Sequence, residues 1–227
     1  MVKEIEKRSL ERKYARVSTA HVRQIGIDEI HVGRNSNRTF CLLTIVRDLQ
    51  SGAVIHVGNG KGISALDSSS KKLRKSKLKF VVMNISNAYA CWLEKYFPKS
   101  RIVFDHFHVI KLMNERLDKL RRRYVAELDV SQRNQFKKLR MLFLRNMEDQ
   151  DEESLLILRN MRKYFTELSD AYMQIEALRS IYATISIALE ARAAFRCWAT
   201  LAAATGSREL VAMAKTIREK LSGIITY

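Results

Sequence analysis

The chain has 227 residues, of which 47% are hydrophobic, enough to build one large domain or a domain with a sizeable insertion. Its 41 Lys and Arg residues against 24 Asp and Glu residues give a formal net charge of +17. This excess favours polyanions, above all nucleic acid, as partners. No stretch approaches the roughly 18 consecutive apolar residues of a membrane-spanning helix, so we expect no membrane association.

The beginning of the chain carries Lys and Arg at scattered positions, which predicts a charged helical lead-in over residues 1–21. The segment has no apolar core followed by small residues, so it does not resemble a secretory signal, and we expect a cytoplasmic protein. Three cysteines, Cys41, Cys91 and Cys197, lack the paired spacing of a zinc site or a disulfide framework. We therefore expect reduced thiols.

From Val22 onwards, short apolar runs separated by turn residues predict strands rather than helices. We expect three strands, over residues 22–30, 38–48 and 52–57. The segment 49–52, Leu-Gln-Ser-Gly, predicts a tight turn between the second and third strands. These three strands are therefore expected to form an antiparallel meander.

The next elements alternate between helix and strand. We expect a basic helix, a buried strand, a second helix and a short strand, over residues 63–76, 78–84, 87–97 and 101–104 respectively. The single proline, Pro98, ends the second helix. Five strands and two helices thus precede residue 105, as expected for an α/β protein.

After His106 the strand signals vanish, and apolar residues recur at the three- and four-residue spacing of helices. The acidic run 148–153 predicts the start of one helix, because carboxylates stabilise the positive end of a helix dipole. The other expected helix starts are Val109, Ser131 and the restart at Gly206 and Ser207, and the last helix is expected to end near Gly223. The second half of the chain is expected to be all-helical.

Three polar residues lie at or just beyond the ends of predicted strands: Asp28, Asn84 and Asp105. Neighbouring strand ends can converge, so we expect these side chains near one edge of a pocket. A phosphoryl-transfer site with two magnesium ions needs hard carboxylate oxygens close together, and Asp28 meets that need. The alternative is that a single strand acid merely faces solvent or pairs with a lysine.

Several motifs resemble the central domain of the ISL3 family of insertion-sequence transposases: IGIDEIH, VVMNISNAYACWLEKYF and RIVFDHFHVIKLMNERLDKLRRR. The most specific is the block formed by Asp105, Phe107, His108, Val109 and Lys111. A strand and Tyr89 precede this block at the distance found in the family. The resemblance covers about residues 1 to 225, nearly the whole chain.

The resemblance implies an RNase H-like mixed five-stranded sheet with helices over residues 22–108, followed by a large all-helical insertion over residues 109–227. It implies cleavage and joining of double-stranded DNA, with Mg²⁺ or Mn²⁺ held by two Asp and one Glu. Asp28 corresponds to the first Asp, a catalytic residue and metal ligand. The second Asp stands five residues before the family's Tyr, where this chain has Asn84.

An amide at position 84 brings no negative charge to a pair of divalent cations, so we expect weak metal affinity. The third family acid is expected beyond Tyr227, with Glu190 as a fallback candidate. Asp105, His108 and Tyr89 are expected to support the site or to orient the DNA backbone. The alternative for His108 is that it caps or packs at the start of the long helix.

Two basic segments offer surfaces that could follow DNA phosphates, although such segments are often only solvated faces. The expected DNA-binding residues are Lys71, Lys72, Arg74, Lys75, Lys77, Lys79, Arg121, Arg122 and Arg123. The family's amino-terminal DNA-reading parts have no counterpart here, so sequence-specific binding is expected to be weak.

The leading hypothesis is thus a fragment of a DDE-type transposase that binds DNA but is catalytically defective. A second is a working metal nuclease that tolerates Asn84. A third is a non-catalytic DNA-binding or helical oligomerisation protein, in which the apolar stretches of residues 175–204 supply the face for a homo-oligomer.

Overall fold

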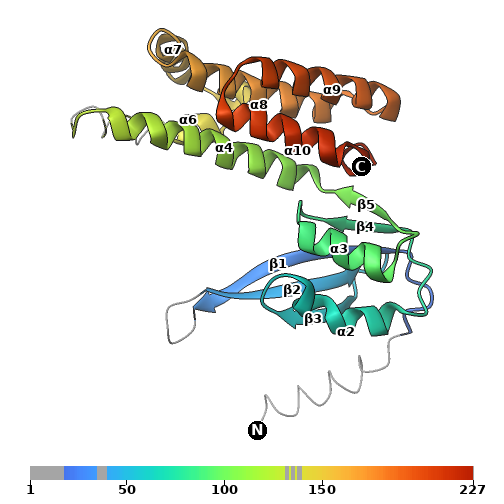
Figure 1. Ribbon diagram of the computed structural model, residues 1–227. Helices are drawn as coiled ribbons and strands as arrows, with labels where there is room; N and C mark the ends of the chain where they lie inside the picture. Colours follow the sequence, from blue (N-terminus) through green and yellow to red (C-terminus); the bar gives the residue numbers. More distant parts are fainter. Residues whose placement is uncertain (1–17, 35–39, 131–132, 134–135, 137–139, 227) are drawn as a thin grey trace. The chain divides into compact units, whose positions relative to one another are not determined.

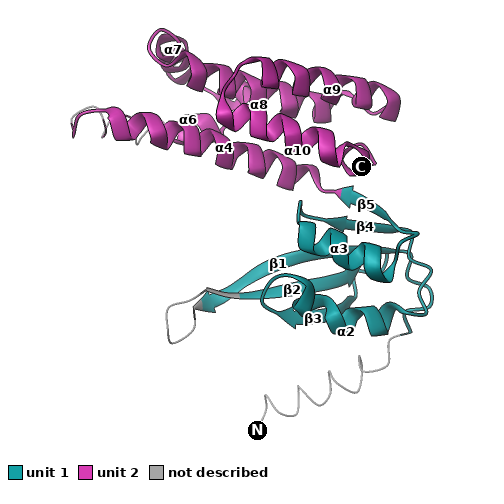
Figure 2. Cartoon of the chain, in the orientation of Figure 1, with its two compact units in different colours: residues 1–103 teal, residues 104–227 magenta. Residues whose placement is uncertain are grey.

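A computed structural model describes residues 18–34, 40–130, 133, 136 and 140–226. The chain divides into two compact units, residues 1–103 and 104–227 (Figure 2). Most of the expected lead-in, the expected helix start at Ser131 and the side chain of Cys41 lie outside the described part.

The first unit is an α/β unit with one mixed sheet. Its strands and helices are β1 (Gln24–Arg34), β2 (Phe40–Asp48), β3 (Val54–Asn59), α2 (Ile63–Leu73), β4 (Phe80–Met83), α3 (Asn87–Tyr96) and β5 (Arg101–Phe104), whose last residue begins the second unit. The sheet order is β3-β2-β1-β4-β5, with β1 antiparallel to β2, β2 antiparallel to β3, and β1 parallel to β4. The meander therefore forms one side of the sheet and the helix-connected strands the other.

The turn between β2 and β3 forms where the sequence predicts it. Asp48 and Ala53 close it with a backbone hydrogen bond of 2.9 Å, and Gly52 has the left-handed φ of 73° that favours glycine. The buried Asp48 carboxylate accepts hydrogen bonds from the backbone N–H groups of Gln50 and Ser51. The hairpin is thus held by its own polar groups.

Helices α2 and α3 cover one face of the sheet (Figure 1). The apolar side chains of β1 and β4 on that face are almost fully buried: Ile25, Ile27, Val81 and Met83. The fully buried Trp92 of α3 also belongs to the core of the unit. Because alternate residues of a strand face opposite sides of the sheet, this face also takes Glu29, two residues after Ile27.

The second unit is entirely helical in the part that the structure describes. Its elements are α4 (His106–Glu127), α6 (Arg140–Leu144), the 3₁₀ turn η1 (Met147–Asp149), α7 (Glu152–Met161), α8 (Thr166–Thr184), α9 (Ala188–Ala204) and α10 (Arg208–Ile224). Asp151 caps α7 by accepting a 2.7 Å hydrogen bond from the backbone N–H of Ser154. The acidic run therefore marks a helix start, as predicted.

The mixed sheet with helices, followed by a helical region, confirms the predicted RNase H-like fold class. The ends of several elements differ from expectation. Strand β1 continues to Arg34, beyond the expected end at residue 30, because it remains paired with β2 up to Phe40. Helix α2 ends at Leu73, three residues early, where the backbone N–H of Ser76 bonds back to the Leu73 carbonyl.

The close packing of β3 against α2 requires glycine at position 58. A Cβ atom there would lie 1.9 Å from the carbonyl oxygen of Ala65. We predict that Gly58→Ala lowers the free energy of unfolding by about 2 kcal/mol or more, because the helix must shift. Urea unfolding measures this loss. The control Asn59→Ala, at an exposed neighbour, should change it by no more than about 0.5 kcal/mol, and an equally small effect of Gly58→Ala would contradict the packing.

Candidate functional site

A polar network joins the end of β4 and helix α3 to Glu29 of β1. The Asn84 side-chain amide donates to Glu29 Oε2 at 2.9 Å, and the Tyr89 hydroxyl donates to Glu29 Oε1 at 2.5 Å. Asn84 directly follows β4, and Tyr89 is on the first turn of α3, fully buried. Both oxygens of one carboxylate are therefore bound by neutral donors.

The register of the sheet adds a fourth residue. Thr44 of β2 lies opposite Glu29 of β1, on the covered face, and is fully buried. Its hydroxyl donates to the carbonyl of Gly60 at 2.8 Å and lies 3.2 Å from the Tyr89 hydroxyl. Because the Tyr89 proton is donated to Glu29, the single Thr44 proton is shared between the Gly60 carbonyl and the Tyr89 oxygen, and this contact helps to position the phenol.

The ionisation of Tyr89 reflects this position. Burial and the hydrogen bond to Glu29 together raise the pKa of Tyr89 from 10 to about 12. Both effects disfavour a phenolate, because it would be desolvated beside a carboxylate. Tyr89 therefore remains a hydrogen-bond donor to Glu29 throughout the neutral pH range.

Asp28 has a different environment from its neighbour. It is exposed, and alternation along β1 places it on the opposite face of the sheet from Glu29. Its Oδ1 accepts a 2.8 Å hydrogen bond from the backbone N–H of Glu29. Asn84 and Tyr89 thus bind Glu29. Asp28, the residue directly before Glu29, faces the other side of the sheet.

Asp105 and His108, the other expected supporting residues, belong to the helical unit. Asp105 is the N-cap of α4, where its carboxylate accepts a 2.9 Å hydrogen bond from the backbone N–H of Phe107. His108 lies in the first turn, with its ring edge-on to that of Phe107. Both residues thus contribute to the start of this helix. Glu190 is exposed in the first turn of α9.

The residues around Glu29 do not fit a pair of divalent cations. A cation needs oxygen ligands, but residue 84 presents its N–H donors to the carboxylate. The other atom of that amide, Oδ1, is buried and lacks a hydrogen-bond partner. Over residues 18–226, apart from the undescribed positions, no group of three or more His, Cys, Asp and Glu side chains could hold a metal ion.

The basic segment at the end of α2 is a solvent-exposed surface. Each of its six cationic side chains is exposed, and none forms an ion pair with another described residue. One of them, Lys72, donates to the carbonyl of Ile55 at 2.9 Å. We call this set the α2 basic surface; it comprises Lys71, Lys72, Arg74, Lys75, Lys77 and Lys79.

The three consecutive arginines of α4 are bound within the helical unit instead. Arg121 is only 7% exposed and binds Asp118 through two hydrogen bonds of 2.7 and 2.9 Å. Arg122 also binds Asp118, and Arg123 binds Glu167 at 2.6 Å. Burial would raise the pKa of the Asp118 carboxyl, but the arginine hydrogen bonds outweigh it and lower the pKa. These cations are therefore partly neutralised before any phosphate arrives.

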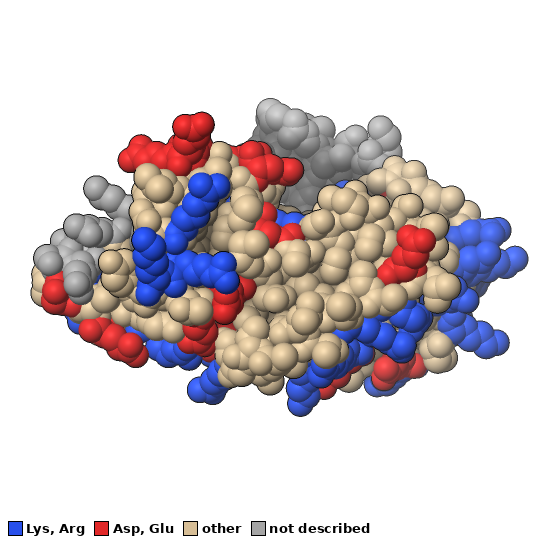
Figure 3. Space-filling model, turned by 90° about the horizontal axis from the view of Figure 1, so that it is seen from above, with Lys and Arg blue, Asp and Glu red and all other residues tan. Residues whose placement is uncertain are grey.

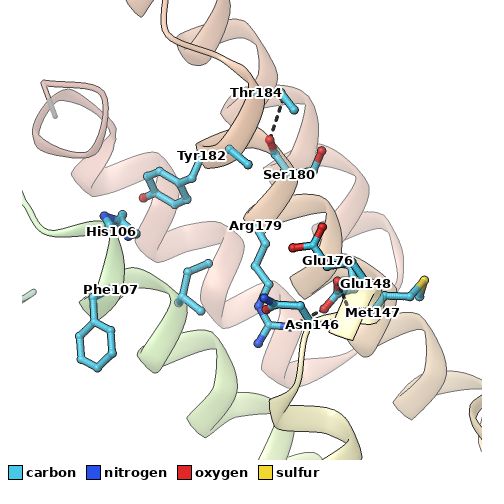
Figure 4. Close-up of a pocket in the computed structure, with 12 residues that line it drawn as sticks. His106, Phe107, Asn146, Met147, Glu148, Glu176, Arg179, Ser180, Tyr182 and Thr184 are labelled. Atoms are coloured by element: carbon cyan, nitrogen blue, oxygen red, sulfur yellow. Dashed lines mark hydrogen bonds and ion pairs between the residues drawn. The ribbon is translucent and has the colours of Figure 1, made fainter. Parts of the chain in front are cut away.

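A cavity of about 990 Å³ lies between the start of α4, η1 and the second half of α8 (Figure 4). Glu176 and Arg179 form an ion pair on its wall, and Glu176 also accepts from the backbone N–H of Met147 at 2.9 Å. Arg179 donates to the carbonyls of Leu144 and Arg145. With Glu148 also on the lining, the acids outnumber Arg179, which does not favour a phosphate there.

Exposed apolar side chains occur on and beside α9, among them Ile187, Leu189 and Leu201. In the view of Figure 3, broad areas carry few charged side chains and are bordered by acidic as well as basic side chains. Among the described residues, no helix combines the length and apolar character needed to cross a membrane.

The sequence reasoning missed Glu29 and Thr44. Glu29 lies two residues after Ile27 and four after Ile25, and this spacing of two predicts that it shares their buried face of the strand. Thr44 had no such signal, because its role depends on being opposite Glu29 in the register.

Comparison with known proteins was consistent in pointing to transposases. The family model of the ISL3-type DDE proteins, described as "Transposase", matches residues 25–227. One relative is the "Transposase for insertion sequence element IS1001" of Bordetella parapertussis, which is 24% identical over 232 residues. That match covers 99% of this chain and 55% of the relative, so the chain spans about half of that protein's length.

The raised pKa of Tyr89 gives a prediction for alkaline pH. Since the folded-state pKa of about 12 lies above the ordinary value of 10, its stabilising contribution is complete below pH 10 and is lost as pH rises through 12. We expect the free energy of unfolding of the wild type, relative to Tyr89→Phe, to fall by about 2 kcal/mol over this range. Urea unfolding at pH 9 and 11.5 tests it, and parallel pH profiles of the two proteins would contradict it.

Proposed function

The chain belongs to the ISL3 family of transposases, and on that premise we propose that it is the DNA-binding core of a DDE-type transposase with weak cleavage and strand-transfer activity. Its family assigns it to DNA transposition. The observation that supports weak chemistry is at position 84, where an amide donates to Glu29 in place of the family's second Asp.

Family transposases generally use divalent metal ions, and the expected ions are Mg²⁺ or Mn²⁺. In such a site the ions supply charge that stabilises the phosphoryl-transfer transition state. By family position, Asp28 is the proposed metal ligand of this chain and Asn84 the residue that weakens the site. Two carboxylates attract divalent ions far more strongly than one carboxylate and one amide.

We assign double-stranded DNA as the partner, bound mainly through its phosphates. The α2 basic surface supports this assignment, because its cations are exposed and largely uncommitted. The arginines at 121–123 contribute less, since Asp118 and Glu167 already bind them. The proposed division is an RNase H-like core over residues 22–108 and a helical insertion over residues 109–227, acting on DNA in the bacterial cytoplasm.

A second candidate function is helical oligomerisation, favoured by the exposed Ile187, Leu189 and Leu201. Sedimentation velocity with and without DNA separates it from the first proposal. A homo-oligomer that forms without DNA and is lost in Leu189→Lys would support it. A monomer that binds DNA would leave the DNA-binding core as the function.

The proposed weakness of the chemistry is tested by nicking of supercoiled plasmid DNA in Mg²⁺ or Mn²⁺. We expect the wild-type rate to lie within about 10-fold of that of Asp28→Ala, because position 84 withholds one charge from the ions. Efficient metal-dependent nicking that Asp28→Ala abolishes would contradict the proposal. It would favour a working nuclease that tolerates Asn84.

The DNA-binding surface is tested by the salt dependence of affinity for random duplex. We expect Lys75→Ala, Lys77→Ala and Lys79→Ala together to reduce the slope of log K against log salt by about 2 to 3, since each phosphate contact contributes roughly 0.9. The matched control replaces Lys95, Lys99 and Arg101, exposed cations of the same unit, and should leave the slope nearly unchanged. Equal slopes for the two triple variants would exclude the α2 basic surface.

A further inference from the structure

The charge of Glu29, in the middle of β1, is compensated without a cation. Its two oxygens accept hydrogen bonds from Asn84 and Tyr89, and neither donor carries a charge. Among the ion pairs of the described residues, none includes Glu29. The carboxylate is therefore held by an amide and a phenol, without a cationic side chain.

The orientation of Asn84 follows from this carboxylate. Turning the amide over would bring Oδ1, an acceptor, against Glu29 Oε2, and two acceptors repel each other. Asn84 therefore directs Nδ2 to Glu29 and leaves Oδ1 buried without a hydrogen-bond partner, which is unfavourable because that oxygen has also lost its contact with water. The bond to Glu29 determines the arrangement even though the other atom of the amide is left unsatisfied.

We infer that the Asn84 amide takes the place that a divalent cation would otherwise occupy beside Glu29, so that this core folds without metal. Residue 84 thereby decides whether the core depends on a cation. The inference concerns the face of β1 that carries Glu29, and does not depend on Asp28, which lies on the opposite face. It rests on the proposed function only for the kind of cation.

An aspartate at position 84 would reverse the situation. Two carboxylates would then lie within the 2.9 Å that now separates Nδ2 from Oε2, beside a hydroxyl that can donate to only one of them. Such a pair is unstable unless a proton or a cation lies between its oxygens. Mg²⁺ and Mn²⁺ prefer these hard oxygens, so the folded state would bind them and be stabilised by them.

The same argument predicts the effect of exchanging the two groups. In the double variant Glu29→Gln with Asn84→Asp, an amide and a carboxylate again face each other. The hydrogen-bond donor is now at position 29 and the acceptor at position 84. The repulsion is removed, and so is the need for a cation. This reversal separates a specific pair from a general effect of added negative charge.

The experiment is thermal unfolding of the full chain in EDTA and in about 10 mM Mg²⁺, with Mn²⁺ titration calorimetry on the same proteins. The proteins are the wild type, Asn84→Asp, Glu29→Gln and the double variant. The control is Asn59→Asp, which adds the same charge at an exposed position on β3. Asn84→Asp is purified in Mg²⁺, so that it can be studied even if it does not fold in EDTA.

We expect the wild type, Glu29→Gln and the control to unfold at the same temperature in EDTA and in Mg²⁺, within about 1 °C each. Asn84→Asp should unfold about 5 °C or more below the wild type in EDTA and regain at least half of that loss in Mg²⁺. The double variant should regain it without metal. Mn²⁺ should bind Asn84→Asp at least 10-fold more tightly than the wild type.

Three results would overturn the inference. They are an unchanged melting temperature of Asn84→Asp in EDTA, equal stabilisation of the wild type by Mg²⁺, and a double variant that depends on the cation as strongly as Asn84→Asp. None of these readouts involves DNA, so the inference can fail while the nicking and salt experiments still support the proposed function, and the reverse also holds.

Discussion

The first unit depends on compensating one carboxylate at the edge of its core. Glu29 lies on the face of β1 that α2 and α3 cover, where it has lost part of its contact with water. Its partners come from the end of β4 and from α3, and Thr44 of β2 supports one of them. Two segments that are distant in sequence, the β1–β2 pair and the stretch from β4 to α3, therefore meet around one charge, which sets the position of Asn84 and Tyr89.

In the helical unit the charges that need compensation are cations. Its α4 helix carries many cations, and buried or half-buried acids accept them: Asp118 binds Arg121 and Arg122, and Glu209 of α10 lies 3.2 Å from Lys119. The pairs of Asp118 lie within α4 and stabilise that helix, whereas the Lys119–Glu209 pair joins α4 to α10. The net charge of +17 is thus unevenly compensated, and the cations of the α2 basic surface are less paired with acids than those of α4.

Much of the fold could be predicted because its signals are local. Alternating apolar residues, the Leu-Gln-Ser-Gly turn and the acidic helix start each act within a few residues. The prediction that residue 84 is an altered position came from resemblance to the family. The partner of that residue could not be predicted, because it depends on which side of β1 faces α3. The burial of Arg121 was likewise hidden, since a run of three arginines does not show which one turns inward.

The central claim is that Asn84 holds Glu29 through its side-chain amide, and nuclear magnetic resonance of that NH₂ group tests it most directly. We expect the Asn84 Nδ2 protons to exchange slowly with water, to shift strongly in Glu29→Gln, and to be unaffected by Mg²⁺. Fast exchange, together with Asn84 chemical shifts that are unchanged in Glu29→Gln but change when Mg²⁺ is added, would contradict the account. It would show an amide that faces solvent and an unassigned cation site beside it.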